Sequence, residues 1–276
     1  MNGTHPAVAP GLGGLAVRAG VCAYVGALVA LPLAALLIEG LGQGAAALWA
    51  AVSAPVAVEA LRLTLLTAGI MALVNAVMGT ATAWVLARYD FPGRGLLSAL
   101  VDLPFAIPTL VTGVMLVLLF GPQSPLGGWL AAEGVRVAFA APSIVLALLF
   151  ITVPFVVRAV EPVLMEQDPA EEEAARTLGA GTFTVFRRVL LPPLFPALLS
   201  GTIRSYARAL GEFGSIVVVS GNIPYQTLTA PIYVFGEIES GRSEVAAAVS
   251  VVLLAVALAL SVGARAIERL TGTARA

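Results

Sequence analysis

The sequence predicts an all-α, polytopic membrane protein with six transmembrane helices, and two observations lead to this prediction. Of the 276 residues, 59% are hydrophobic and only 11% are charged, whereas a soluble domain usually carries about a quarter charged residues. Several uncharged runs also reach the roughly 20 residues that a helix needs to cross a bilayer. Burying this much apolar surface from water would need a core larger than the chain can build, so lipid is the expected solvent.

Each predicted helix corresponds to one uncharged run. The runs are Ala19–Ile38, Leu63–Ala87, Leu103–Ala132, Val137–Val157, a stretch that begins at Val189, and Val245–Ala264. The first run is 20 residues long. This exceeds the about 7–15 residues of a signal-peptide core, and no small-residue cleavage pattern lies inside it. We therefore expect this run to be retained as the first span.

Two of the runs need closer boundaries. The third is too long for one span, so we expect its helix to end near Gly121–Pro122, where the turn-forming sequence GPQSPLGG begins. The fifth helix is expected to start near Pro192 and to end near Ser220–Pro224, because the sequence SGNIP again favours a turn.

All fifteen basic residues are arginines, and their placement predicts the orientation. Ten of them flank the predicted helices on the side that holds both termini, and three lie in the loops of the other side. Positive charge collects on the cytoplasmic side of a membrane. We therefore expect a multi-pass protein of the cytoplasmic (inner) membrane with both termini in the cytoplasm.

The absence of lysine also limits the chemistry that the chain can perform. A Walker A loop uses a lysine to reach the β- and γ-phosphates, so this chain is not expected to bind ATP in that way. The sequence has one histidine and one cysteine, too few for a zinc site or an internal disulfide. We expect no catalytic residue, no metal and no cofactor.

One segment is rich in charge. The sequence EEEAARTLGAGTFTVFRRVLLP, residues 171–192, contains three glutamates and three arginines. Asp168, followed by a proline and then by a glutamate at the third helical position, is a typical helix start. Glu172 and Arg176 stand four residues apart in the favourable order, and Gly179 offers a helix stop. We expect a helix of about 10 residues between spans four and five; from composition alone it is either a solvated linker or a docking surface.

The spacing EAA-x3-G-x9-V-x-LP within this segment resembles the EAA loop in the membrane subunits of ATP-binding-cassette importers, with a valine where isoleucine is usual. In that family the loop forms a coupling helix, which docks in a groove on the ATPase subunit. The resemblance implies that the residues at this joint are Glu173, Ala174, Ala175 and Gly179.

Longer stretches resemble the sulfate/thiosulfate importer permeases, most of all the T-type of the two paired permeases. They are RYDFPGRGLLSALVDLPFAIPTLVTG (88–113), PFVVRAVEPVL (154–164) and ARALGEFGSIVVVSGNIP (207–224). The phrase LGEFG also occurs in molybdate permeases, so a molybdate or tungstate importer permease is the alternative. The resemblance covers about residues 58–267. It defines an importer-type transmembrane domain, which follows an N-terminal segment with the first helix (1–57) and precedes a cytoplasmic tail (268–276).

The resemblance implies a permease that translocates sulfate or thiosulfate into the cytoplasm, while ATP is hydrolysed on other subunits. The implied partners are two copies of the ATPase, a second permease of the W-type, a soluble sulfate-binding protein and membrane lipid. A molybdate permease would instead form a homodimer, and no nucleic acid is expected in either case. An ion-gradient-driven transporter and a membrane scaffold or sensor are two further classes, which the EAA-like loop disfavours.

Three charged residues on the fifth predicted helix, Arg204, Arg208 and Glu212, follow one another at intervals of four and would share one helix face. An arginine near the middle of a bilayer costs about 2.5–3.5 kcal/mol on insertion scales, so it is expected to face the bundle interior or a water-filled path. This face either lines the translocation path for a dianion, or Arg208 and Glu212 form a pair that holds helices together.

We also make predictions for three further residues and one loop. Asp102 is expected to cap the start of the third span. Gly211 and Gly214 flank Glu212, where they permit either close helix packing or a hinge. The partly apolar loop Asn222–Arg242 forms either a surface helix or a contact for a binding protein.

Overall fold

The computed structural model describes residues 12–270, which form helices and connecting turns without a strand. In chain order the helices are α1 (Leu12–Gly42), α2 (Gly44–Val52), α3 (Pro55–Arg88), α4 (Arg94–Ala106), α5 (Thr109–Phe120), α6 (Pro125–Ala132), α7 (Ala141–Glu166), α8 (Pro169–Thr177), α9 (Thr182–Val185), the π-helical η1 (Phe186–Leu190), α10 (Leu191–Leu210), α11 (Gly214–Val219), α12 (Ala230–Glu239) and α13 (Ser243–Leu270). The all-α prediction is confirmed. Most of the predicted tail at 268–276 lies outside the described residues.

Among the described residues, five helical stretches are long and apolar enough to cross a membrane. They are Gly14–Gly42, Pro55–Arg88, Ala141–Glu166, Thr182–Leu210 and Ser243–Ala266. The pair α4 and α5 passes the same test as a unit but bends by 113° at the break between the two helices. The protein is therefore a multi-spanning helical membrane protein with five spans, or six if the bent pair counts as one.

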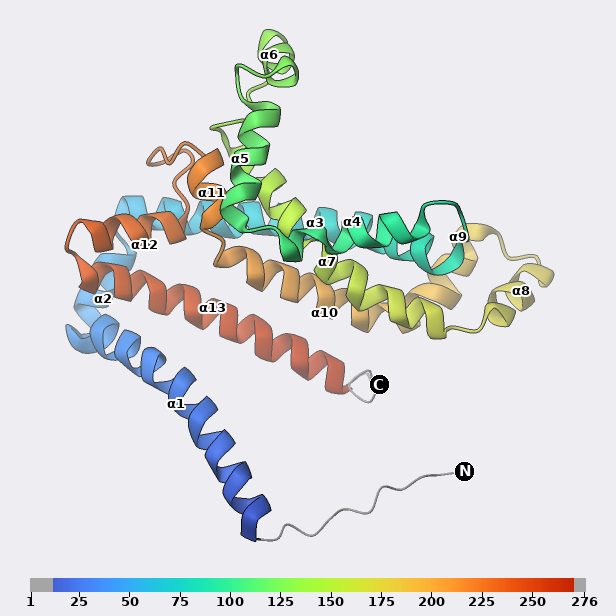
Figure 1. Cartoon of the computed structure of the whole chain (residues 1–276), viewed down its shortest axis with the longest axis horizontal. Helices are drawn as coiled ribbons and strands as arrows, with labels where there is room; N and C mark the ends of the chain where they lie inside the picture. The colour runs from blue at the N-terminus through green and yellow to red at the C-terminus, as the bar shows by residue number, and fades with distance from the viewer. Residues whose placement is uncertain (1–11, 271–276) are drawn as a thin grey trace.

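The long helices run lengthwise in one bundle (Figure 1). α8 lies at one end of this bundle, and α2 and α12 lie at the opposite end. α1 meets α13 near Gly40, where an added β-carbon would lie 2.9 Å from a methyl group of Val251. From that contact α1 diverges toward its N-terminal end, and α5 with α6 projects from the middle of the bundle.

The core of the bundle lies where α3, α7 and α10 meet, and small residues allow the helices to approach closely. One of its two clusters of buried residues comprises Ala68, Met71, Ala72, Ile144, Leu148, Ala209, Leu210, Ile216 and Ile232. Gly79 of α3 faces Val156 of α7 at a distance where an added β-carbon would lie 2.9 Å away. Asn75 also donates a hydrogen bond of 2.8 Å to Oγ1 of Thr152. α3 and α7 are therefore joined by both close packing and a buried polar contact.

The third predicted span differs from expectation. Its helix begins at Arg94, well before Leu103, and breaks at Ile107–Pro108. A proline disfavours helical geometry in the residue before it, and Ile107 is extended, with φ −86° and ψ 127°. Asp102 therefore lies inside α4, and the prediction that it caps a helix start is wrong.

The fifth predicted span also breaks earlier than expected. α10 ends at Leu210 and a separate helix, α11, begins at Gly214, so the prediction of one helix up to Ser220–Pro224 is wrong. Gly211 follows the last residue of α10, and glycine costs about 1 kcal/mol relative to alanine inside a helix. Apolar residues resume at Phe213 after the single charge of Glu212, and one charge does not mark a helix end, which is why the sequence pattern missed this boundary.

The two interrupted spans meet at their breaks. An added β-carbon on Gly214 would lie 2.3 Å from Oγ1 of Thr109, the first residue of α5. A β-carbon on Gly113 of α5 would lie 2.6 Å from the carbonyl oxygen of Ser215 in α11. Gly214 thus serves close packing, one of the two roles that the sequence left open.

The loop before the last span contains α12, so the prediction of a helix there is confirmed. Ala230 donates a backbone hydrogen bond of 2.8 Å to Oγ1 of Thr64 in α3. Arg242 donates two hydrogen bonds to the carboxylate of Glu237, at 2.6 and 2.9 Å, and the hydrogen bond from Arg242 holds the pKa of that carboxyl below its usual 4.5. A contact of this loop with a binding protein stays a prediction.

Candidate functional sites: the end helix α8 and the interrupted span

The charged segment forms a short helix with a specific signal at each end. Oδ1 of Asp168 accepts a hydrogen bond of 2.9 Å from the amide of Ala170, which confirms the predicted cap. At the other end Gly179 adopts φ +84°, a conformation that glycine adopts without strain. Its amide donates to the carbonyl of Arg176 and the amide of Ala180 donates to the carbonyl of Ala175, at 2.9 and 3.0 Å. These two bonds form a Schellman stop, so the whole of α8 is held in one conformation.

The two faces of α8 differ in exposure. Glu172 points inward and is 8% exposed; Nη2 of Arg88 lies 2.9 Å from its Oε1, and Nη2 of Arg176 lies 3.4 Å from its Oε2. Glu173 and Ala174 are exposed, and Ala175 is half-buried. The predicted i, i+4 pair is confirmed, while the buried partner Arg88, 84 residues earlier in the chain, is a contact that the sequence analysis missed.

Apolar groups surround the outer face of α8. Leu178 is 89% exposed and Phe183 is 73% exposed, the former just before Gly179 and the latter just after it. A cleft of about 410 Å³ lies between α8 and the end of α3. Its lining residues are Trp84, Ala87, Arg88, Tyr89, Pro169, Glu172, Glu173 and Arg176. This end of the bundle (Figure 1) therefore presents small, apolar and charged groups together on a rigid turn.

The charged residues of the fifth span are only partly brought together. Nη2 of Arg208 lies 2.9 Å from Oε2 of Glu212, and Glu212 is 2% exposed. Oε1 of Glu212 accepts hydrogen bonds from the amide and the hydroxyl of Ser215, at 3.0 and 3.1 Å. Glu212 therefore binds the start of α11 and the end of α10 across the break. Arg204 lies one turn earlier and lines a separate cleft between α10 and α13 with Arg265.

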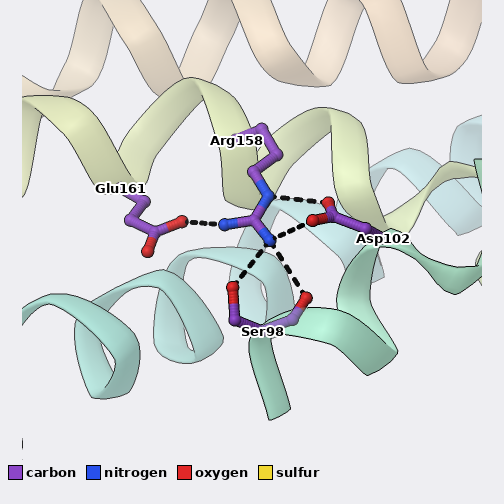
Figure 2. Close-up of polar contacts among 4 residues, drawn as sticks. All are labelled: Ser98, Asp102, Arg158 and Glu161. Atoms are coloured by element: carbon purple, nitrogen blue, oxygen red, sulfur yellow. Dashed lines mark hydrogen bonds and ion pairs between the residues drawn. The ribbon is translucent and has the colours of Figure 1, made fainter. Parts of the chain in front are cut away.

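The sequence analysis did not identify a further group of charged residues, which is centred on Arg158. Figure 2 shows Arg158 of α7 reaching toward α4, where Nε and Nη2 donate to the two carboxylate oxygens of Asp102 at 2.8 and 2.6 Å. Nη2 also donates to the carbonyl and the hydroxyl of Ser98, at 3.0 and 2.9 Å, and Nη1 contacts Oε2 of Glu161. One guanidinium thus joins two helices through a bidentate pair, the geometry that arginine favours with carboxylates. Asp102 and Arg158 lie in two of the quoted motifs, but their pairing across 56 residues has no local signal.

These features define a class of protein. A bundle of membrane-crossing helices with two spans interrupted near its middle, and a rigid charged helix at one end, is the membrane subunit of a transporter. The chain belongs to the family of binding-protein-dependent transport system inner membrane components, whose model matches residues 75–272.

Named relatives cover most of the chain. It is 45% identical over 230 residues to the "Probable sulfate transport system permease protein cysT" of Nephroselmis olivacea, covering 83% of this chain and 81% of the relative. It is 41% identical over 237 residues to the sulfate transport system permease protein CysT of Escherichia coli strain K12, covering 86% of each chain. Among solved structures, a chain of a bacterial alginate ABC transporter in complex with a pentasaccharide-bound periplasmic protein matches with a TM-score of 0.75 at 19% identity, over 93% of this chain and 95% of that one. This last similarity supports the fold.

Proposed function

We propose that this chain is the membrane-spanning permease subunit of an ATP-driven importer that translocates sulfate, and also thiosulfate, into the cytoplasm. The names of the relatives support sulfate as the substrate and do not support the molybdate alternative. The chain itself performs no bond chemistry. ATP is hydrolysed on partner subunits, in keeping with a sequence in which all basic residues are arginines.

The observation that carries this proposal is the construction of α8. Glu173, Ala174, Ala175 and Gly179 form the joint with the ATPase, because small side chains allow close approach and Glu173 is exposed to pair with a basic residue. Leu178 and Phe183 add apolar anchors at the same end. Caps at both ends keep α8 in one conformation, so a push on its outer face moves it as a rigid unit.

The orientation follows from the arginines near α8. Positive charge marks the cytoplasmic side, and the α8 end of the bundle holds Arg88, Arg94, Arg176, Arg187 and Arg188. α8 therefore faces the cytoplasm, and the arginines that flank the predicted helices predict the same side for both termini. The ATPase docks at this end, and a soluble sulfate-binding protein delivers the anion at the end with α2 and α12.

The translocation path lies beside the interrupted spans. α5 and α6 project from one side of the bundle (Figure 1), where a second permease, of the W-type that the resemblance implies, completes the path. Arg208 is about one-third exposed and already paired with Glu212, which leaves a weak positive field. Conduction requires binding that is weak enough to release the ion, and a paired arginine meets this requirement. Arg204 stands one turn earlier on α10, in the separate cleft with Arg265, and we assign it to the same path.

The test of the docking proposal is the charge reversal Glu173→Arg in the assembled importer. We expect the ATPase subunits to stop co-purifying with the permease and sulfate uptake to be lost, because the reversed charge would remove the proposed pairing of Glu173 with a basic residue of the ATPase. Glu133→Arg is the matched control, since Glu133 is also exposed but follows α6, away from α8. Normal uptake by a well-expressed Glu173→Arg variant would show that α8 does not dock the ATPase.

A further inference from the structure

The last two turns of α3 hold the α8 segment at two points. Arg88, the final residue of α3, is 15% exposed at its side chain and lies beneath α8 against Glu172. One turn earlier, Trp84 stacks on Phe186 of η1, with ring centroids 5.5 Å apart and planes 7° from parallel. The two α3 residues stand four apart and so share one helix face. That face contacts the chain both before and after Gly179.

A polar link connects the same point to the chain on both sides of α8. Nη1 of Arg88 donates to the carbonyl of Gln167, just before α8, at 3.4 Å. Nε2 of Gln167 donates to the carbonyl of Leu190, at the end of η1, at 3.4 Å. Arg88 therefore contacts both α8 and Gln167, the residue just before the α8 cap. Gln167 in turn contacts Leu190, at the end of the segment that follows α8.

The contact between Arg88 and Glu172 has unused hydrogen-bonding capacity. Nη2 of Arg88 is close to the carboxylate without the alignment of a hydrogen bond, and Nε is buried with no acceptor among the described residues. A buried donor left without an acceptor is costly. A shift of α8 that aligned the carboxylate with Nε and Nη2 would be favoured by the new bonds. The ion pair can thus differ in energy between two positions of α8, which any coupling element requires.

α3 is well placed to pass such a shift onward. It packs more extensively against α7 than against any other helix, and Ala83 and Leu86 lie in one buried cluster with Val156 and Val160 of α7. α3 also contacts α10, where Tyr206 donates to the carbonyl of Leu65 at 3.2 Å. Because this packing is tight, displacement of the Arg88 end moves α7 and α10 with it.

We propose that the ion pair between Arg88 and Glu172 is a positioning contact that transmits the movement of α8 into α3. It acts in parallel with the covalent connection from α8 through η1 to α10. Through this contact α3, like α10, moves with α8 during the transport cycle. This inference rests on the proposed function, in which α8 moves with the ATPase.

The experiment compares Arg88→Gln, Glu172→Gln and the double variant in the full importer, reconstituted in vesicles with ATPase, second permease and binding protein. The readouts are ATP hydrolysis and the sulfate taken up per ATP hydrolysed. Coupling between two sites is typically about 5- to 150-fold, so we expect about a tenfold fall in sulfate per ATP for each single variant. The double variant should fall no further, and Arg88→Lys should recover part of the loss.

The control is Glu171→Gln, which removes an exposed charge from the same turn of α8 and should keep normal sulfate uptake per ATP. Unchanged coupling in Arg88→Gln and Glu172→Gln, or losses that add in the double variant, would overturn the proposal. Loss of the co-purifying ATPase in both single variants would also overturn it, since the contact would then serve assembly. Failure of the proposed function would show differently, as a wild-type complex without sulfate-dependent turnover.

Discussion

Replacing Arg158 by leucine should loosen α4 from α7, because this guanidinium is the main polar link between the two helices (Figure 2). The change leaves two carboxylates without their cation. Glu161 is 13% exposed and Asp102 is 49% exposed at their side chains, so most of the cost falls on Glu161.

The expected magnitude follows from these exposures. Removing one partner of a buried ion pair costs about 3–5 kcal/mol, whereas an exposed pair contributes about 0–1 kcal/mol. Because this group is only partly buried, we expect Arg158→Leu to destabilise the protein by about 3 kcal/mol. For a chain of this size that corresponds to a melting temperature lower by roughly 6–12 °C.

The assay is thermal unfolding of the purified protein in detergent micelles, followed by tryptophan fluorescence. The matched control is Arg94→Leu, whose partner Asp90 is 94% exposed at its side chain, so that variant should lose less than about 1 kcal/mol. Equal melting temperatures for the Arg158 and Arg94 variants would refute the reasoning. They would show that the contacts of Arg158 with Asp102 and Glu161 add no more stability than an exposed ion pair does.

Two further predictions concern packing and pH. Gly113→Ala should destabilise the protein by about 1–3 kcal/mol, because the new methyl group would lie 2.6 Å from the backbone oxygen of Ser215. Gly26→Ala, with open space around its α-carbon, is the control for the same unfolding measurement, and a loss there as large as at Gly113 would contradict the packing argument. The hydrogen bond from Arg242 lowers the pKa of Glu237, so this pair stabilises the fold above pH 4.5, the usual pKa of the carboxyl, and the stabilisation is lost as the pH falls through the lower folded-state pKa. Melting curves of wild type and Glu237→Gln should therefore differ at neutral pH and converge in acid; a gap that persists in acid would count against the ion pair as its cause.

Local signals in the sequence were sufficient for the α8 segment and for the membrane class. The cap at Asp168, the stop at Gly179 and the pair Glu172–Arg176 each depend on residues within one or two turns, and all three are present. Uncharged runs located the membrane-crossing helices because the need for about 20 apolar residues is a property of composition.

Contacts between distant segments were not predictable from the same signals. Apolar residues resume at Phe213 after the single charge of Glu212, so hydrophobicity alone could not separate α10 from α11. The packing of Gly214 against Thr109 shows that the break belongs to the crossing of two interrupted spans. Arg88 finds Glu172 84 residues away, and Arg158 finds Asp102 and Ser98 56 and 60 residues away, so only the fold brings these groups together.

The charged stripe of the fifth span shows a different limit. The interval of four residues correctly indicated that Arg208 and Glu212 can meet, and their ion pair is present. Glu212 nevertheless lies beyond the end of α10, so the three residues do not share one continuous helix. Whether this stripe lines the path depends on the second permease, and it stays a prediction.

The most direct test of the proposed function is uptake of radiolabelled sulfate by cells that lack this chain, before and after its gene is restored. Excess thiosulfate and excess molybdate serve as separate competitors. We expect restored uptake that thiosulfate blocks and molybdate leaves nearly unchanged. Absence of chain-dependent sulfate uptake, together with chain-dependent accumulation of molybdate, would contradict the proposed substrate and leave only the importer architecture.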